Sequence, residues 1–386
     1  MPVSDGSLAR RLREQLQALD RVGLRRMLRP PSGVDLSSND YLGLAQHPLL
    51  KQRMAEAVLA QGCGSTGSRL LRGERASFSR LERRFAAFKN TERSLYFSSG
   101  YLANIAVLST FSEHNDVIFS DERNHASLID GARLSRARRV VYPHCDLAAL
   151  ERLIQENRPF GQAFVVTESL FSMDGDFAPL AELAALCRRS EAALIVDEAH
   201  AVGIYGERGS GLIEAAGVGD DVFVSINTAG KALGVAGAFV AASALAIETL
   251  IQRARPFIFS TASPPPVVAA LDASLDLIDA EPERRASVVE RAQYLRRRLG
   301  ESGVAIPEGA SQIVPVLIGS NERAVAVAEE LQRAGFDVRA IRPPSVPDGT
   351  ARLRISVNAG LSYDTIDRFA GAMAAALQQS TCAASS

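Results

Sequence analysis

Between residues 90 and 280 the sequence alternates short apolar runs with longer helical stretches, and this alternation constrains the possible folds most strongly. Six runs are rich in β-branched or aromatic residues, and a seventh, "AGAFVAA", ends the series at 236–242. Strands that alternate with helices form a mainly parallel sheet, because each helix carries the chain back across one face. We therefore predict an α/β fold with helices covering both faces of its central sheet. The six runs lie at 94–97, 116–120, 138–142, 163–167, 193–197 and 222–226.

The flanking regions have a different pattern. Residues 7–28 are helix-like and precede the Pro-rich segment "RPPSG", and a second helix is expected from about 48 to 60. A long amphipathic helix begins near residue 283, and shorter apolar runs and further helices follow it. We expect an N-terminal helical segment over 1–47, a large domain over 48–283 and a smaller α+β C-terminal domain over 284–386.

Charge and cysteine content exclude several classes of protein. The net charge is −1, from 43 basic and 44 acidic residues, so nothing favours nucleic acid or an anionic membrane. No apolar run approaches the roughly 20 residues that span a bilayer, and the charged N-terminus is unlike a signal peptide. The four cysteines form no C-x-x-C pair and the five histidines lack metal-ligand spacing, so no metal is expected. We expect a cytoplasmic protein.

Two short motifs invite nucleotide-binding interpretations that their surroundings contradict. "GCGSTG" at 62–67 matches G-x-G-x-x-G, but a helical pattern precedes it where the dinucleotide fingerprint requires a strand. "DEAH" at 197–200 is typical of helicases, which also need the phosphate loop G-x-x-x-x-G-K-[ST]. Around Lys231 the first glycine position is Ser225 and the residue after the lysine is Ala232. We interpret neither motif as a nucleotide site.

Chemically suggestive residues follow several predicted strands. In open parallel sheets ligands bind at the carboxyl ends of the strands. Ser98, Ser99 and Gly100, followed by Tyr101, open a helix after the first run, which suits a phosphate group. His125 follows the second run, "ESLFSMDGD" follows the fourth, and Asp197 and His200 follow the fifth. The sixth run leads to Lys231 in "NTAGKALGVAG", a stretch without any acidic residue.

Together these residues suit pyridoxal phosphate. Burial lowers the pKa of a lysine until its amine becomes nucleophilic, and this cofactor needs such a lysine, a phosphate site and a carboxylate for its ring nitrogen. Each residue alone is weak evidence. An aspartate at a strand end is often a helix N-cap, a loop histidine often has no special role, and Ser-Gly is common in turns. Their shared position at one sheet edge supports the cofactor site.

Long motifs then resemble the α-oxoamine synthase family of fold-type I pyridoxal-phosphate enzymes over nearly the whole chain. They include "LSSNDYLGL", "GSTGSRLLRG", "FSSGYLAN", "TESLFSMDGD" and "VDEAHAVGIYGERGSG". The ending "IRPPSVPDGTARLR" resembles the biotin-pathway branch, whose members condense L-alanine with a pimeloyl group on CoA or on a carrier protein. A sister synthase, such as a glycine C-acetyltransferase, remains an alternative. So does a cofactor-free, non-catalytic subunit that retains the fold.

The resemblance implies a role for each matching position. Lys231 would form the Schiff base with the cofactor and act as the base, and Asp197 would face the pyridine nitrogen. His125 would stack on the ring and contact substrate, and His200 would lie near the phenolic oxygen. The other implied cofactor positions are Gly100, Tyr101, Ser172, Thr228, Ser260 and Thr261. Ser260 and Thr261 would reach the phosphate of a neighbouring subunit, which implies a homodimer with shared active sites. The implied substrate positions are Arg354 for the amino-acid carboxylate and Arg25 and Ser345 for the acyl group.

Overall fold

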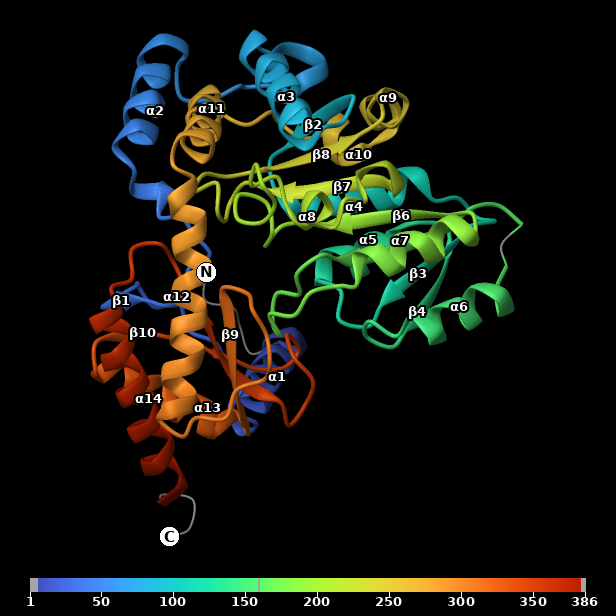
Figure 1. Ribbon diagram of the computed structural model, residues 1–386. Coiled ribbons are helices and arrows are strands. Elements are labelled where there is room, and N and C mark those ends of the chain that lie inside the picture. The colour runs from blue at the N-terminus through green and yellow to red at the C-terminus, as the bar shows by residue number, and fades with distance from the viewer. Residues whose placement is uncertain (1–5, 159, 383–386) are drawn as a thin grey trace.

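The central sheet of the computed structural model, which describes residues 6–158 and 160–382, has seven strands in the order β2-β8-β7-β6-β5-β3-β4 (Figure 1). β8 pairs antiparallel with both of its neighbours, and every other pairing is parallel. The prediction of a mainly parallel sheet is therefore confirmed, and each of the seven apolar runs forms a strand. The strands are β2 (Arg93–Phe97), β3 (Val117–Asp121), β4 (Arg138–Tyr142), β5 (Ala163–Glu168), β6 (Ala192–Asp197), β7 (Val222–Thr228) and β8 (Ala238–Ala242).

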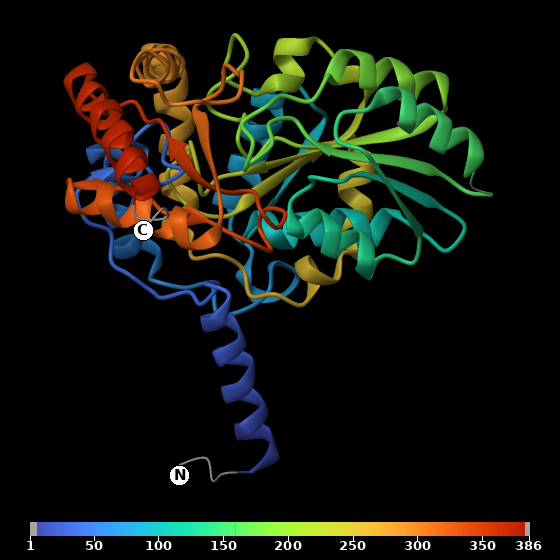
Figure 2. The same cartoon turned by 90° about the horizontal axis from the view of Figure 1, so that it is seen from below.

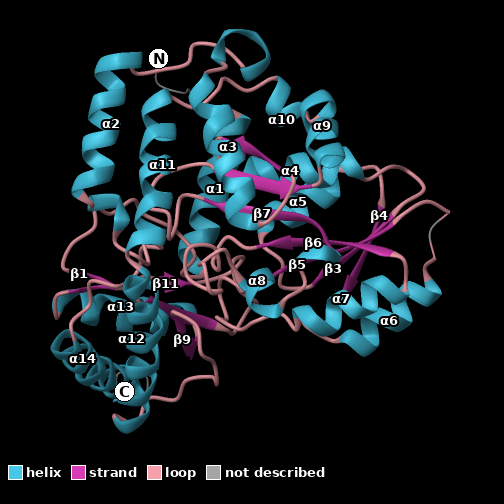
Figure 3. Ribbon diagram, turned by 45° about the horizontal axis from the view of Figure 1, so that its top comes forward, coloured by secondary structure: helices cyan, strands magenta, loops and turns pink. Residues whose placement is uncertain are grey.

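Helices cover both faces of this sheet (Figure 3). Neighbouring residues of one strand belong to opposite cores: Ile118 packs in one cluster, whereas Val117 and Phe119 pack in another. Continuous apolar runs are typical of strands that are buried on both faces. The first cluster includes residues of α4 (Gly100–Phe111), α5 (Ala126–Leu134), α9 (Ala244–Arg253) and α10 (Arg255–Ile258), and the second includes residues of α6 (Leu147–Glu156) and α7 (Leu180–Arg189).

A smaller unit follows the long helix α12 (Pro282–Glu301), which runs into it from the end of α11 (Pro265–Ala280) (Figure 1). Its antiparallel sheet has the order β11-β12-β9 and packs with the surrounding helices around a separate apolar core. The division into three domains remains a prediction. The elements of this unit are β9 (Ile313–Gly319), α13 (Asn321–Arg333), β10 (Phe336–Asp337), β11 (Ala340–Ile341), β12 (Ala351–Ser356) and α14 (Tyr363–Cys382).

The N-terminal segment is tied to the small unit. β1 (Val34–Asp35) pairs in parallel with β10. Helix α1 (Ser7–Arg21) extends away from the rest of the described chain (Figure 2). The helix was expected to reach residue 28, and this was wrong: it ends at Arg21 because Gly23 adopts a positive φ of 63° that stops helical hydrogen bonding.

The remaining helices pack around the large sheet. α2 follows η1 and packs extensively on α11, and its observed bounds agree with the helix expected at 48–60. Among the helices that the structure describes, none is long and apolar enough to cross a membrane. These elements are η1 (Leu44–Gln46), α2 (Pro48–Gln61), η2 (Arg69–Gly73), α3 (Ala76–Lys89), α8 (Leu212–Ala216) and η3 (Gly219–Asp221).

Candidate active site

The carboxyl ends of β5, β6 and β7 bring the central predicted residues together. Lys231 lies in the turn between β7 and β8, and its Nζ is 2.7 Å from Nε2 of His200, which follows β6. Asp197 ends β6 and is paired in register with Glu168 at the end of β5. Parallel strands place their carboxyl ends at one edge, which is why residues distant in sequence meet here.

The amine of Lys231 is held in a partly desolvated environment. Burial lowers the pKa of Lys231 to about 8, although the nearby carboxylates of Asp197 and Glu168 act in the opposite direction. Among the residues that the structure describes, no carboxylate forms an ion pair with Lys231. A substantial fraction of this lysine is therefore an uncharged nucleophile at mildly alkaline pH.

His200 is a neutral imidazole between two polar partners. It is buried, and besides Lys231 it contacts the phenol of Tyr41, with Nδ1 2.7 Å from the Tyr41 oxygen. Burial, followed by the positive charges of Lys231 and Arg354, lowers the pKa of His200 well below its usual range. It therefore carries a single ring proton and no charge at neutral pH.

Asp197 is a buried carboxylate whose hydrogen-bond partners in the described part of the chain are neutral groups. Its side chain accepts hydrogen bonds from Asn104 Nδ2 at 2.7 Å and from the backbone N–H of Ala199 at 2.8 Å. Within residues 6–158 and 160–382 it forms no ion pair, although it is only 5% exposed. Buried charges normally have an opposite charge beside them. A protonated pyridine nitrogen would supply that charge, so the residues of the site fit pyridoxal phosphate.

His125 is the N-cap of α5. Its Nδ1 lies 2.7 Å from Ser127 Oγ, and its backbone N–H donates to Glu168 Oε1 at 2.7 Å. Burial raises the pKa of Glu168 to about 8, and the Asp197 carboxylate adds to this effect, whereas Lys231 opposes it. Burial also lowers the pKa of His125. The imidazole is thus fixed on a helix start and can present a ring face to a ligand.

Gly100 and Thr228 approach each other closely at the start of α4. A Cβ placed on Gly100 would lie only 2.4 Å from Thr228 Oγ1, so no larger residue fits. Ser99 caps α4 by accepting from Leu102 N at 3.2 Å. The exposed backbone N–H groups at such a helix start suit a phosphate. The neighbouring Tyr101 is half-exposed, and its hydroxyl donates to Asp130.

Arg354 enters the site from β12 of the small unit. Its guanidinium donates to the backbone oxygen of Ser172 at 2.5 Å, to Ser356 Oγ at 2.6 Å and to the phenol of Tyr41 at 3.0 Å. A guanidinium has five N–H groups. In the described part of the chain these contacts engage three of them, which leaves two for a carboxylate.

The implied acyl-side residues lie in different places. Ser345 shares a cavity of about 480 Å³ with His125 and Ser172. Arg25 does not line it. Arg25 pairs with Asp20 at 2.7 Å and lines a separate groove near α13. Its assignment to the acyl group thus receives no support from this single chain.

Ser260 and Thr261 lie in the loop between α10 and α11 and line a narrow pocket with Ser98 and Tyr96. Lys231 is not among the described residues that line this pocket. The backbone N–H of Ala262 bonds to Gly67 O at 2.9 Å, which ties this loop to the 62–74 segment.

Several residues that contact the predicted site were not assigned roles from the sequence. Among them are Tyr41, which contacts His200, Asn104, which contacts Asp197, and Glu168, which accepts from the backbone of His125. All three lie inside the quoted motifs "LSSNDYLGL", "FSSGYLAN" and "TESLFSMDGD". The motifs therefore indicated the segments that form the site, but the structure is needed to show which of their side chains point into it.

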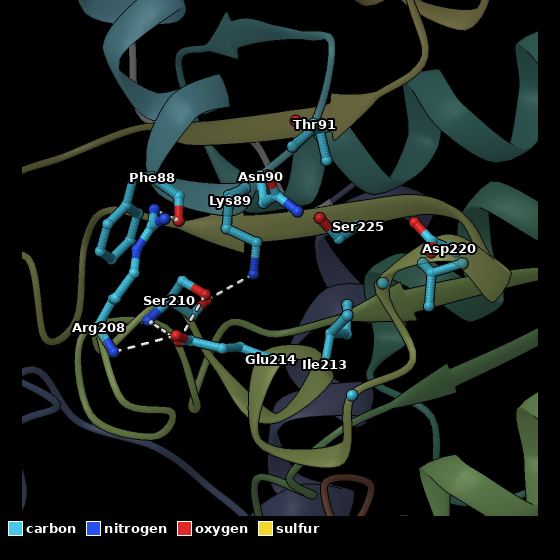
Figure 4. A pocket seen from close by; sticks show the side chains of 14 residues that line it. Phe88, Lys89, Asn90, Thr91, Arg208, Ser210, Ile213, Glu214, Asp220 and Ser225 are labelled. Atoms are coloured by element: carbon cyan, nitrogen blue, oxygen red, sulfur yellow. Dashed lines mark hydrogen bonds between the residues drawn. The ribbon is translucent and has the colours of Figure 1, made fainter.

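A second large cavity, of about 450 Å³, lies beside the end of α3 and contains none of the predicted residues (Figure 4). Its polar groups bond to one another. Lys89 Nζ donates to Glu198 Oε2 and to Ser210 O, both at 2.5 Å. Glu214 accepts from the backbone N–H groups of Arg208 and Ser210, both at 3.0 Å. These contacts stabilise a turn.

Asp121, His144 and Cys145 lie close enough together to hold a metal ion, a possibility that the sequence spacing did not suggest. However, His144 bonds through Nδ1 to Asp121 at 2.9 Å and through Nε2 to Asp176 at 2.6 Å. Burial alone would lower the pKa of His144, but these carboxylates outweigh it and raise the pKa to about 12. An imidazolium has no lone pair for a metal, so the charged ring occupies the position of a cation.

Comparison with known proteins identifies the family. The profile of "Aminotransferase class I and II" matches residues 31–373. The chain belongs to this family. It is 46% identical to the 8-amino-7-oxononanoate synthase of Anaeromyxobacter dehalogenans, over 94% of both chains. It is also 46% identical to that of Geobacter sulfurreducens, over 95% of this chain and 98% of the relative. The resemblance to α-oxoamine synthases is therefore confirmed.

Solved structures share the whole fold. A serine palmitoyltransferase from S. paucimobilis with bound PLP–myriocin superposes with a TM-score of 0.91 at 28% identity, covering 98% of this chain and all of the other. The 8-amino-7-oxononanoate synthase of Francisella tularensis superposes with a TM-score of 0.79, also at 28% identity, covering 90% and 98%. The fold is that of a fold-type I pyridoxal-phosphate transferase, as predicted.

Proposed function

We propose that this chain is a pyridoxal-phosphate-dependent 8-amino-7-oxononanoate synthase. It joins L-alanine to the pimeloyl group of a thioester, releasing CO2 and the thiol of CoA or of a carrier protein. The observation that supports this chemistry is the Lys231 amine, whose pKa is lowered to about 8 and which lies beside a neutral imidazole. The nearby Asp197 carboxylate is buried and forms no ion pair within the described residues. The relatives that are 46% identical over 94% of their length support the choice of substrates.

The cofactor would be held by residues from several elements. When bound, it supplies an electrophilic carbonyl carbon for amines and an electron-accepting ring that stabilises negative charge at the Cα of the amino acid. Lys231, Asp197, His125 and His200 would surround the ring. The remaining contacts would come from Gly100, Tyr101, Ser172 and Thr228, with Ser260 and Thr261 of a second subunit at the phosphate.

The chain's own residues would then carry out binding and proton transfer. Lys231 removes the Cα proton with Nζ and later returns a proton to the product, because its pKa lies near the working pH. The Asp197 carboxylate stabilises positive charge on the ring nitrogen. Arg354 binds the alanine carboxylate with its two remaining N–H groups, which orients the Cα–H bond. Ser345 contributes to the cavity for the acyl group.

A homodimer would complete this site. Exposed apolar residues lie next to the loop that carries Ser260: Leu71 is 81% exposed and Phe259 is 70% exposed. Helix α1 also presents Leu8, Leu12 and Leu16 to solvent at four-residue spacing, a stripe that a partner would cover. We place the enzyme in the cytoplasm, since the free cysteines Cys63, Cys145 and Cys187 are compatible with a reducing compartment.

Thiol release from cofactor-loaded protein tests this function. L-Alanine, glycine and L-serine are each combined with pimeloyl-, acetyl-, succinyl- and palmitoyl-CoA, with Lys231→Ala as the blank. We expect release only with L-alanine and pimeloyl-CoA. A preference for glycine or serine with another acyl chain would move the enzyme to a sister activity. If the grid is silent, pimeloyl-carrier protein replaces CoA, and silence there too refutes the proposal.

A further inference from the structure

The phenol of Tyr41 lies where three polar groups of the site converge. Tyr41 is fully buried, and its oxygen lies 2.7 Å from His200 Nδ1, 3.0 Å from Asn39 Oδ1 and 3.0 Å from Arg354 Nη2. Burial raises the pKa of Tyr41, so its hydroxyl keeps its proton at neutral pH. Three partners on one hydroxyl restrict where hydrogens can lie.

With the Asn39 amide oriented so that Oδ1 faces the phenol, counting hydrogens selects one arrangement. A phenol offers one hydrogen and accepts up to two hydrogen bonds, and a guanidinium can only donate. Arg354 therefore donates to Tyr41, and the phenol hydrogen goes either to Asn39 or to His200. If it went to His200, the Asn39 and Tyr41 oxygens would face each other at 3.0 Å without a hydrogen. If it goes to Asn39, His200 donates from Nδ1, and all three contacts are hydrogen bonds.

The other side of the ring agrees with this arrangement. A neutral imidazole carries one N–H, so a proton on Nδ1 leaves a lone pair on Nε2. Lys231 Nζ lies 2.7 Å from Nε2, and an ammonium can only donate. The lysine holds its proton at neutral pH, since its pKa is about 8. Both ends of the chain of contacts thus require the same tautomer of His200.

We propose that Tyr41 is a positioning residue that fixes His200 in the Nδ1–H tautomer and so makes Nε2 the hydrogen-bond acceptor for Lys231. Its catalytic meaning rests on the proposed function: the acceptor would hold the lysine amine in place and stabilise its protonated form. The other charged or titratable side chains that influence this pair are Asp197, Glu168, Arg354 and His125.

The tautomer can be measured in cofactor-free protein. In protein with ¹⁵N-labelled histidine, two-bond ¹H–¹⁵N correlations distinguish a protonated ring nitrogen from one with a lone pair, and His200→Gln assigns the signal. We expect Nδ1–H in the wild type. Tyr41→Phe removes the acceptor for this buried N–H, so His200 should change to Nε2–H. Asn39→Leu should cause the same change with Tyr41 in place, because the phenol hydrogen then turns to Nδ1.

A second measurement follows Lys231 itself. The sequence has only three lysines, so the Cε resonance of ¹³C-labelled Lys231 can be assigned with Lys231→Ala and titrated with pH. Tyr41→Phe should lower its titration midpoint by about one pH unit, the loss of one hydrogen bond to a charged group. Tyr294→Phe is the control: its hydroxyl donates to Asp367 Oδ1 at 2.8 Å between α12 and α14 of the small unit, so neither readout should move.

The outcomes separate this proposal from the proposed function. An Nε2–H tautomer in the wild type would overturn it. So would an unchanged tautomer and lysine midpoint in both Tyr41→Phe and Asn39→Leu. If Tyr41→Phe does not fold, Asn39→Leu decides. Both measurements use protein without cofactor or substrate, so a failure of the thiol-release assay leaves them interpretable.

Discussion

Lys89 and Lys231 are both withdrawn from solvent, yet their surroundings differ in kind. Lys89 forms an ion pair with Glu198 at 2.5 Å, and both side chains are almost fully buried. Lys231 instead has a neutral imidazole at 2.7 Å, and its nearby carboxylates do not pair with it within the described residues. A buried lysine in an ion pair stabilises structure, whereas a buried lysine without one retains a reactive amine.

The acid near Lys231 and the acid paired with Lys89 are adjacent in sequence. Asp197 faces the candidate site, whereas Glu198 accepts hydrogen bonds from Lys89 and from the backbone N–H groups of Leu212 and Ile213. The motif "DEAH" thus supplies one carboxylate to the candidate site and another to the ion pair of Lys89, which lines the cavity in Figure 4. Neighbouring residues at a strand end point in opposite directions, which separates their roles.

Replacing Lys231 should cause the largest effect. Lys231→Ala removes the nucleophile and base, so we expect turnover to fall by more than about 10³-fold. The fold should persist, because Lys231 forms no ion pair within the described residues. Thiol release and thermal unfolding are measured on the same preparation. Activity above about one-tenth of the wild type would contradict the catalytic role.

Replacing Lys89 should instead reduce stability. Lys89→Met leaves Glu198 buried without its cation, which should lower the free energy of unfolding by about 3–5 kcal/mol. Urea denaturation measures this, with Lys89→Met/Glu198→Met as the control in which both charges are removed. The double variant should recover much of the loss. If Lys89→Met destabilised by less than about 1 kcal/mol, the pair would not be structural.

Replacing Asp197 should mainly reduce activity, whereas replacing the adjacent Glu198 should mainly reduce stability. Asp197→Asn should lower turnover by roughly 10²–10³-fold, by analogy with the loss of one preorganised electrostatic group. It should fold well, because Asn104 Oδ1 is buried without a partner among the described residues and can accept from the new amide after rotation. Glu198→Gln should lose stability and keep a normal turnover per folded molecule. Equal activity losses in both variants would remove the distinction between a catalytic Asp197 and a structural Glu198.

The sequence predicted the sheet and the central residues, but not the contacts between distant segments. Continuous apolar runs between helices determine a parallel sheet. Parallel strands then place Asp197, His200 and Lys231 at one edge, whatever the packing of the individual side chains. The pairing of Tyr41 with His200 depends on how the N-terminal segment crosses to the large sheet, which no local pattern encodes. The opposite directions of Asp197 and Glu198 likewise depend on where β6 ends.

The pH dependence of stability gives the smallest and most specific test. The pKa of Lys231 falls from 10.5 when unfolded to about 8 when folded. Below pH 8 both states are protonated, and the folded protein bears the full cost of a desolvated ammonium. Between pH 8 and 10.5 the unfolded state binds more protons, so stability rises with pH relative to a chain without this lysine.

Cofactor-free Lys231→Met should therefore be more stable than the wild type at pH 7, and the difference should narrow by roughly 2–3 kcal/mol up to pH 10.5. Urea denaturation of both proteins at each pH measures this, and taking the difference cancels the titration of tyrosines common to both. A difference that stays constant from pH 7 to 10.5 would mean that folding leaves the Lys231 amine as basic as in the unfolded chain. Lys231 and Lys89 would then differ in their hydrogen-bond partners, but the pKa of Lys231 would give no reason for its amine to be more reactive.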